Sequence, residues 1–244
     1  MYSSNGFNIR EFTALDSTNG EAWRRLEELD DRSVILTAQQ TGGRGHGGSA
    51  WESEAGKNIT MTILLKPRQL PAGEQFLVSM LVSLATRDLV ERYVDGCTVK
   101  WPNDVYVGNR KIAGILIEHV VARDAISLSL CGVGLNVNQT RFTSGAPNPV
   151  SLCQLLGGEL PMRQVLDELL AALDARLRAP RDIPGTQREY VSCLYRGTGV
   201  HAWEDEEGIF TATIRGVNEY GQLLLEDETG QRRAYGFKEV GHVL

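Results

Sequence analysis

The 244-residue sequence has few of the residues that metal centres and disulfide frameworks need. It contains no Cys-x-x-Cys pair, which zinc sites and thiol-disulfide motifs usually show. We therefore predict buried free thiols at all four cysteines: Cys97, Cys131, Cys153 and Cys193. The histidines form no cluster either, and we predict surface or structural roles for three of them: His119, His201 and His242.

Long apolar runs and an excess of positive charge are also missing. The longest apolar stretch, 76–85, is too short to span a bilayer, and the first residues do not form a cationic start followed by an apolar run. Lys and Arg number 25 against 31 Asp and Glu, so the formal net charge is −6. We therefore expect a cytoplasmic protein with neither membrane nor nucleic acid as a partner, in which any basic site is local.

A glycine-rich loop is the most unusual stretch that the sequence does contain. Five of the seven residues at 42–48 are glycine, and the other two, Arg44 and His46, can both carry positive charge. Glycine allows close backbone approach to a ligand, and arginine presents a fixed fork of donors to planar anions. Trp51 follows closely, which argues against a plain flexible connector. We expect an anion-binding loop, although no lysine follows Gly48 as a P-loop requires.

Hydrophobic periodicity predicts a protein of mixed α and β structure. Strands are expected at 33–39, 58–66, 110–118 and 125–138. The stretch 98–107 has strand-like ends that Pro102 interrupts. Helices are expected at 20–31, 73–93, 151–156, 162–177 and 186–194. After Arg196 the pattern changes to short strands separated by turns, typical of a small β-barrel with too little core to be stable alone. The sequence therefore predicts one domain boundary, near residue 195.

Charged and polar residues cluster between two of the predicted strands. Lys100, Asn103, Asp104 and Lys111 fall within twelve residues. Charges within strands usually face solvent, but with Arg44 these side chains could hold several anionic oxygens, and Asp104 one divalent cation. Covalent catalysis has no candidate, because the sequence lacks both Gly-x-Ser-x-Gly and a Ser-His-Asp order of the hydrolase type.

Three adjacent polar residues, Ser17, Thr18 and Asn19, precede the first predicted helix. Such residues are favoured at helix N-caps, because their side chains accept hydrogen bonds from free backbone N–H groups. The same three side chains could equally hydrogen-bond a small ligand. Both interpretations stay open at this point.

Four motifs, in this order and spacing, resemble those of bacterial biotin protein ligases. They are QTGGRGHGG at 40–48, KWPND at 100–104, RKIAGIL at 110–116 and GVGLN at 132–136. Ser17-Thr18-Asn19 fits as well, and the resemblance runs from about Ile9 to the C-terminus. Lipoate ligases, which share the fold, would show a different glycine-rich arginine motif and would lack the tryptophan-proline pair.

The resemblance implies a fold and a reaction. The fold is α+β: a mixed-sheet catalytic domain of the class II aminoacyl-tRNA synthetase and biotin/lipoate ligase type at 1–194, and an SH3-like β-barrel at 195–244. The reaction is ATP-dependent activation of biotin to biotinyl-5′-AMP, then transfer to a lysine of a biotin carboxyl carrier domain of the acetyl-CoA carboxylase type. The alternatives are a lipoate or octanoate ligase and a non-catalytic module that binds biotin or a nucleotide.

The matching motifs also imply roles for individual residues. Biotin is expected to contact Ser17, Thr18, Asn19, Gln40, Arg44, Gly45, His46, Lys111 and Gly114. ATP is expected to contact Trp51, Lys100, Asn103 and Asn136. Arg44 and Lys111 would bracket the biotin carboxylate and the α-phosphate, and Asp104 would meet the incoming lysine amine. Mg²⁺ is expected to bind through the phosphates and not at a metal site of the protein.

Two features depart from the family pattern. The Ser17 motif comes so early that we expect neither the winged-helix domain of the longer members nor sequence-specific DNA binding. At His46, many relatives have a second arginine. The resemblance leaves the oligomeric state open: an exposed strand edge could pair two chains in a homodimer.

His46→Arg is expected to slow the release of biotinyl-AMP, because a guanidinium keeps the positive charge that imidazole loses above its pKa of about 6.5. The measurement is the dissociation rate of the intermediate below and above that pH. The difference between the two proteins should be larger at the higher pH. An equal off-rate for both would contradict the role of His46.

Overall fold

A mixed β-sheet forms the larger part of the protein. The computed structural model describes residues 1–45, 48–144 and 148–243, and within them eight strands pair in the order β1-β2-β3-β4-β8-β7-β6-β5. Their bounds are β1 Tyr2–Ser4, β2 Phe7–Leu15, β3 Ser33–Gln40, β4 Asn58–Leu65, β5 Cys97–Lys100, β6 Asp104–Val107, β7 Arg110–Ala122 and β8 Ala125–Asn136. β2 and β3 run parallel, whereas β3, β4, β8 and β7 pair antiparallel.

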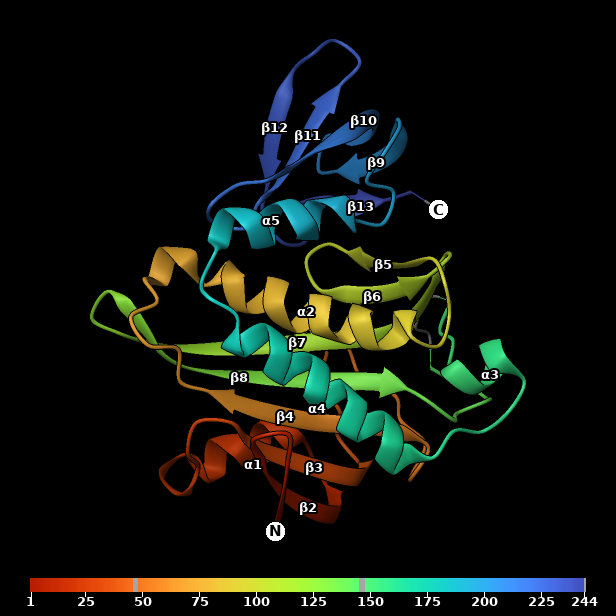
Figure 1. Ribbon diagram of the computed structural model, residues 1–244. Coiled ribbons are helices and arrows are strands. Elements are labelled where there is room, and N and C mark those ends of the chain that lie inside the picture. The colour runs from red at the N-terminus through yellow and green to blue at the C-terminus, as the bar shows by residue number, and fades with distance from the viewer. Residues whose placement is uncertain (46–47, 145–147, 244) are drawn as a thin grey trace.

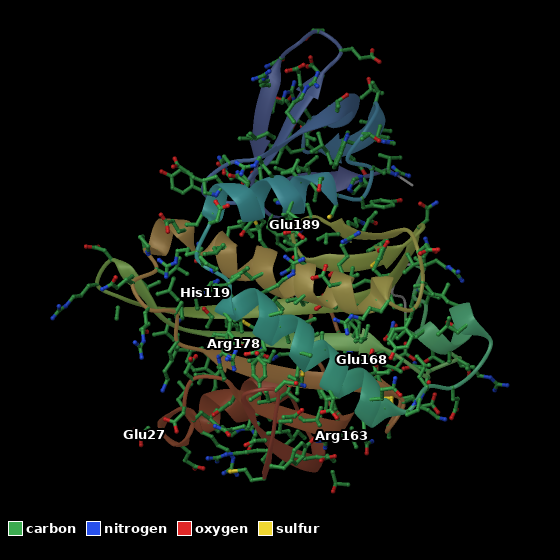
Figure 2. The ribbon with its side chains drawn as sticks, in the orientation of Figure 1. Glu27, His119, Arg163, Glu168, Arg178 and Glu189 are labelled. Atoms are coloured by element: carbon green, nitrogen blue, oxygen red, sulfur yellow. The ribbon has the colours of Figure 1, made fainter. Side chains whose placement is uncertain are left out.

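Five α-helices are present in the described residues: α1 Thr18–Arg24, α2 Phe76–Glu91, α3 Leu152–Leu156, α4 Met162–Arg178 and α5 Ile183–Ser192. α2 and α4 lie together in front of the sheet in Figure 1. α4 buries an apolar stripe that includes Leu169 and Leu173, while Arg163 and Arg178 lie on its exposed side (Figure 2). None of the described helices is both long and apolar enough to cross a membrane.

The predicted elements are present, except that the helix expected at 20–31 ends at Arg24 and a short 3-10 helix follows at Leu26–Glu28. The sequence pattern did not indicate β1 and β2, because β2 alternates imperfectly and is largely exposed along its second half. Cys97, Cys131 and Cys153 are buried free thiols, as predicted. The prediction for Cys193 is wrong: this thiol is only half-buried, because it lies at the C-cap of α5, where the helix ends near the surface.

The two faces of the sheet are covered differently. On one face, Met61 and Ile63 of β4 belong to the main core with α2 and α4. On the other face, α1 covers a smaller core that includes Leu64 and Leu130. Since side chains alternate along a strand, this second face continues from Leu64 to Thr62 and Thr60. The apolar core under α1 therefore ends at Leu64, and the next positions on this face of β4 are polar. The candidate site lies at these polar positions.

Glycines continue this second face on the neighbouring strands. Thr62 of β4 is the register partner of Gly132 on β8, and Thr60 is the partner of Gly134. On the other side of β8, Gly134 pairs with Gly114 of β7. Register partners project to the same face of a sheet, so Gly114, Gly132 and Gly134 leave an area without side chains beside the two threonines. We call this area the glycine floor.

The C-terminal region forms a second sheet that docks on the first. In its described part, strands β9 His201–Asp205, β10 Gly208–Val217, β11 Leu223–Asp227, β12 Arg232–Tyr235 and β13 Gly241–His242 pair antiparallel in the order β12-β11-β10-β9-β13. Trp203 and Leu225 belong to the same hydrophobic cluster as α2. Trp101 Nε1 also donates to Gly221 O at 2.9 Å. The α+β class is confirmed, and the domain boundary near residue 195 stays a prediction.

The docking contact at Gly221 gives a prediction of stability. Gly221 and Gly230 both lie in β-turns with φ near +80°, at +81° and +83°. A Cβ at Gly221 would overlap the Phe76 ring, whereas a Cβ at Gly230 would meet no atom within 4 Å. Gly230→Ala should therefore lower the free energy of unfolding by about 1–2 kcal/mol, from the left-handed backbone alone. Gly221→Ala should lower it by a further ~1–3 kcal/mol from overpacking.

Urea denaturation of the two variants and the wild type measures the difference. The two substitutions add the same methyl group at nearly the same backbone angle, so Gly230→Ala controls for backbone strain. Equal losses of stability would contradict close packing of the C-terminal sheet on α2.

Candidate functional site

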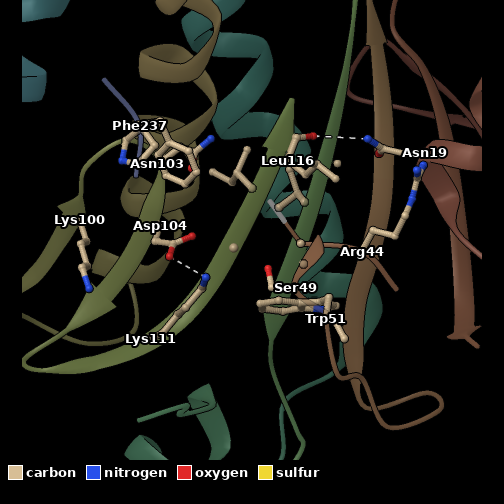
Figure 3. Close-up of a pocket in the computed structure, with 18 of the residues that line it drawn as sticks. Asn19, Arg44, Ser49, Trp51, Lys100, Asn103, Asp104, Lys111, Leu116 and Phe237 are labelled. Atoms are coloured by element: carbon tan, nitrogen blue, oxygen red, sulfur yellow. Dashed lines mark hydrogen bonds and ion pairs between the residues drawn. The ribbon is translucent and has the colours of Figure 1, made fainter. Parts of the chain in front are cut away.

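A cavity of about 390 Å³ lies on the glycine floor of the sheet, between the first sheet and the C-terminal unit. Figure 3 shows this region in close-up. The structure brings most of the predicted residues together there. The lining includes Ser17, Thr18, Asn19, Gln40, Arg44, Gly45, Trp51, Lys100, Asn103, Asp104, Lys111 and Gly114. Residues from distant parts of the sequence thus share one cavity.

Two predicted residues are not in that set. Asn136 is buried and does not line the cavity; its Nδ2 donates to Val150 O at 3.0 Å, so it ties the loop before α3 to β8. Its Oδ1 is buried and has no hydrogen-bond partner among the described residues, and the contact between Asn136 and ATP stays a prediction. His46 lies outside the described residues.

Neutral polar groups of α1 line one end of the cavity. Ser17 is the N-cap of α1, and its hydroxyl accepts from Gly20 N at 3.3 Å, so the capping interpretation is confirmed. Thr18 and Asn19 follow in the first turn, each only 3% exposed, and line the cavity. The backbone N–H of Thr18 donates to Gln40 Oε1 at 2.8 Å. The helix start therefore presents amide and hydroxyl groups to a ligand.

The opposite end of the cavity is cationic. Lys111 Nζ lies 2.6 Å from Asp104 Oδ2, and 5.7 Å from the centre of the Trp51 ring system. Lys100 lines the same end, and its burial lowers the pKa of its ammonium group, with Asp104 opposing and Lys111 reinforcing this effect. In Figure 3, Lys111 and Asp104 face each other, while Arg44 extends from the glycine loop toward the Asn19 side. The cavity therefore offers more positive than negative charge, although the whole chain is acidic.

Trp51 lies against the glycine floor. A Cβ at Gly114 would be 2.8 Å from Cζ3 of the indole, and a Cβ at Gly134 would overlap the indole ring. The indole Nε1 is buried and has no hydrogen-bond partner among the described residues. A flat aromatic face and an unused donor thus lie beside the ammonium group of Lys111, which suits a planar, nitrogen-rich ligand.

Sequence reasoning missed the contribution of the C-terminal unit. Phe237, Lys238 and His242 line the cavity, together with Trp203. His242 stacks on Trp203 with ring centres 4.0 Å apart, and burial lowers the pKa of this histidine to about 3. It is therefore a neutral packing residue, as its predicted structural role requires. No motif marks these residues, because the docking of one unit on the other brings them to the site.

The donor set does not suit a metal bound by the protein alone. No group of three or more His, Cys, Asp or Glu side chains that could hold an ion occurs in the described ranges. Of the described residues that line the cavity, Asp104 alone has a carboxylate, and it already pairs with Lys111. Mg²⁺ commonly binds through one or two carboxylates together with substrate phosphates. The site therefore fits a magnesium ion that arrives with a nucleotide.

Three comparisons place the chain among known proteins. A protein of Paracoccus denitrificans named biotin–[acetyl-CoA-carboxylase] ligase is 29% identical over 230 residues, covering 89% of this chain and 93% of that one. The bifunctional ligase/repressor BirA of Bacillus spizizenii is 27% identical over 212 residues, which cover 83% of this chain. The match spans 64% of the length of that relative.

The fold matches that of a solved structure. The biotin protein ligase from Aquifex aeolicus, in complex with biotin and ATP, has a TM-score of 0.79 and 22% identity, covering 97% of this chain and 99% of that one. Residues 11–136, which contain all the motifs described above, match the family described as "Biotin/lipoate A/B protein ligase family". This match spans more than half of the sequence, so the chain belongs to the biotin/lipoate A/B protein ligase family.

Proposed function

We propose that this protein is an ATP-dependent biotin protein ligase. It activates biotin as biotinyl-5′-AMP and transfers the biotinyl group to a lysine of a biotin carboxyl carrier domain. The observation that carries the proposal is the division of the cavity into a neutral polar end, at Thr18 and Asn19, and a cationic end, at Lys100 and Lys111. Biotin has the matching polarity, with a ureido ring at one end and a carboxylate at the other.

The first step requires two negatively charged reactants to meet. A carboxylate oxygen of biotin attacks the α-phosphorus of ATP, and the bond from that phosphorus to the bridging oxygen breaks, releasing pyrophosphate. Lys111 and Arg44 are proposed to bracket the carboxylate and the α-phosphate, with Lys100 nearby. Fixed positive groups lower the barrier because they meet charge that develops in the transition state. No nucleophilic side chain is needed.

The second step forms the amide. The ε-amine of the carrier lysine attacks the acyl carbon, the bond to the phosphate oxygen breaks, and AMP leaves. Asp104 is proposed to accept the proton of the incoming amine. In this structure Asp104 pairs with Lys111 at 2.6 Å. When phosphate draws Lys111 away, the carboxylate becomes available to the amine, so one ion pair can serve both steps.

The nucleotide is proposed to bind beside the cationic end. Trp51 would face the adenine with its indole ring, which lines the cavity. Lys100 and Asn103 would lie near the phosphates, with Mg²⁺ held mainly by the phosphate oxygens. Asn136 lies outside the cavity lining, and its contact with the nucleotide stays a prediction.

The chief alternative is lipoate or octanoate as the acid, because the family includes lipoate ligases. Pyrophosphate exchange into ATP, measured with each acid in turn, separates the possibilities. We expect exchange with biotin, and an exchange rate at least about 10²-fold lower with lipoate or octanoate. These acids cannot form the hydrogen bonds of a site built for a ureido group. Preference for lipoate would favour the alternative, and tight binding of biotin without exchange would indicate a non-catalytic module.

Lys111→Ala should reduce biotin-dependent pyrophosphate exchange by on the order of 10²-fold or more, as loss of a charge-stabilising group typically does. Lys57→Ala is the matched control. Lys57 also forms an ion pair at 2.6 Å, with Glu159, but does not line the cavity, and its loss should leave exchange nearly unchanged. Near-normal exchange by Lys111→Ala would contradict the role assigned to this lysine.

A further inference from the structure

A glutamate outside the cavity lining contacts a residue at the polar end of the cavity. Glu118 lies on β7, and its Oε2 accepts from Nδ2 of Asn19 at 2.7 Å. The same Nδ2 lies 3.5 Å from the carbonyl oxygen of Leu116. A carboxylate and a carbonyl can only accept hydrogen bonds, so the atom that faces them must be the amide nitrogen. This contact therefore fixes which way the Asn19 side chain is turned.

The opposite atom of the amide faces the cavity floor. Oδ1 of Asn19 would lie 2.5 Å from a Cβ at Gly132, so it sits directly above this glycine. The hydroxyl of Thr62 lies 2.5 Å from Oδ1 and 2.8 Å from the hydroxyl of Thr18. Since Thr62 has one hydroxyl proton and Oδ1 can only accept, that proton goes to Asn19.

Gln40 Oε1 receives the backbone N–H of Thr18 at 2.8 Å. The single hydroxyl proton of Thr18 serves either Gln40 Oε1, at 3.1 Å, or the Thr62 hydroxyl, at 2.8 Å, because the Thr62 proton is already used. Asn19 Oδ1 receives one proton, from Thr62, and keeps one lone pair. The amide of Asn19 therefore presents an acceptor, not a donor, above the floor. A ligand that reaches this end must supply a hydrogen-bond donor, such as an N–H group, to satisfy it.

We propose that Glu118 is a positioning residue that selects biotin: by holding the amide nitrogen of Asn19, it turns Oδ1 toward the ureido N–H of the substrate. This inference rests on the proposed function. Without the acceptor at Glu118, the Asn19 amide can rotate and present its NH₂ group to another donor. A dithiolane ring has no N–H group, so the same geometry discriminates against lipoate.

Glu118→Met tests the inference, since it removes the acceptor and keeps an unbranched side chain of similar length. The expected result is a rise of about tenfold or more in the KM for biotin, the scale of a lost buried hydrogen bond to a charged group, with kcat and the KM for ATP nearly unchanged. Glu118→Gln still offers a side-chain oxygen and should keep most of the biotin affinity. Glu11→Met, on an exposed position of β2, is the matched control and should behave as wild type.

A double-mutant cycle separates positioning from general damage to the fold. In an Asn19→Ala background, Glu118→Met should have little further effect on the KM for biotin, because the group that it positions is gone. Additive effects of the two substitutions, or a Glu118→Met protein that matches Glu11→Met, would overturn the inference. A rise in the KM for ATP as large as that for biotin would also overturn it. If wild-type protein shows no biotin-dependent exchange, the proposed function fails instead.

Discussion

The absence of side chains at three neighbouring sheet positions is the constraint on which the site depends. Gly114, Gly132 and Gly134 share one face of β7 and β8. A Cβ at Gly132 would collide with Asn19, and a Cβ at either of the others would collide with Trp51. Glycine normally weakens a strand interior. Here it allows a helix start and an aromatic ring to approach the sheet backbone, and a cavity forms where a core would otherwise continue.

The two ends of the cavity follow from the elements that border this floor. The apolar contact between α1 and the sheet extends as far as Leu64, and the start of α1 places Asn19 at one end of the cavity. The β5–β6 hairpin and β7 bring Asp104 and Lys111 to the other. A neutral hydrogen-bonding end and a charged end thus lie on one rigid sheet. Under the proposed function, this arrangement would orient the acid without any covalent contact and direct its carboxylate toward a phosphate.

Much of this could be predicted from the sequence, and the exceptions have physical causes. Periodicity marked β4, α2 and α4, because each buries a regular pattern, and the motifs brought Arg44, Lys111 and Asp104 together. Asn136 matches a motif but does not line the cavity, because a motif gives spacing and not the direction of a side chain. Glu118 and His242 were missed as part of the site because their positions depend on pairing and docking between distant segments. β1 and β2, at the exposed edge of the sheet, carry too weak an alternation to be recognised.

A crystal structure of the protein with biotin bound tests the proposed orientation of biotin most directly. We expect the ureido ring above Gly132, with an N–H group within hydrogen-bond distance of Asn19 Oδ1, and the carboxylate next to Lys111. Asn19 should keep its nitrogen on Glu118. A biotin bound in the reverse direction, or a ureido group that meets the nitrogen of Asn19, would contradict the account.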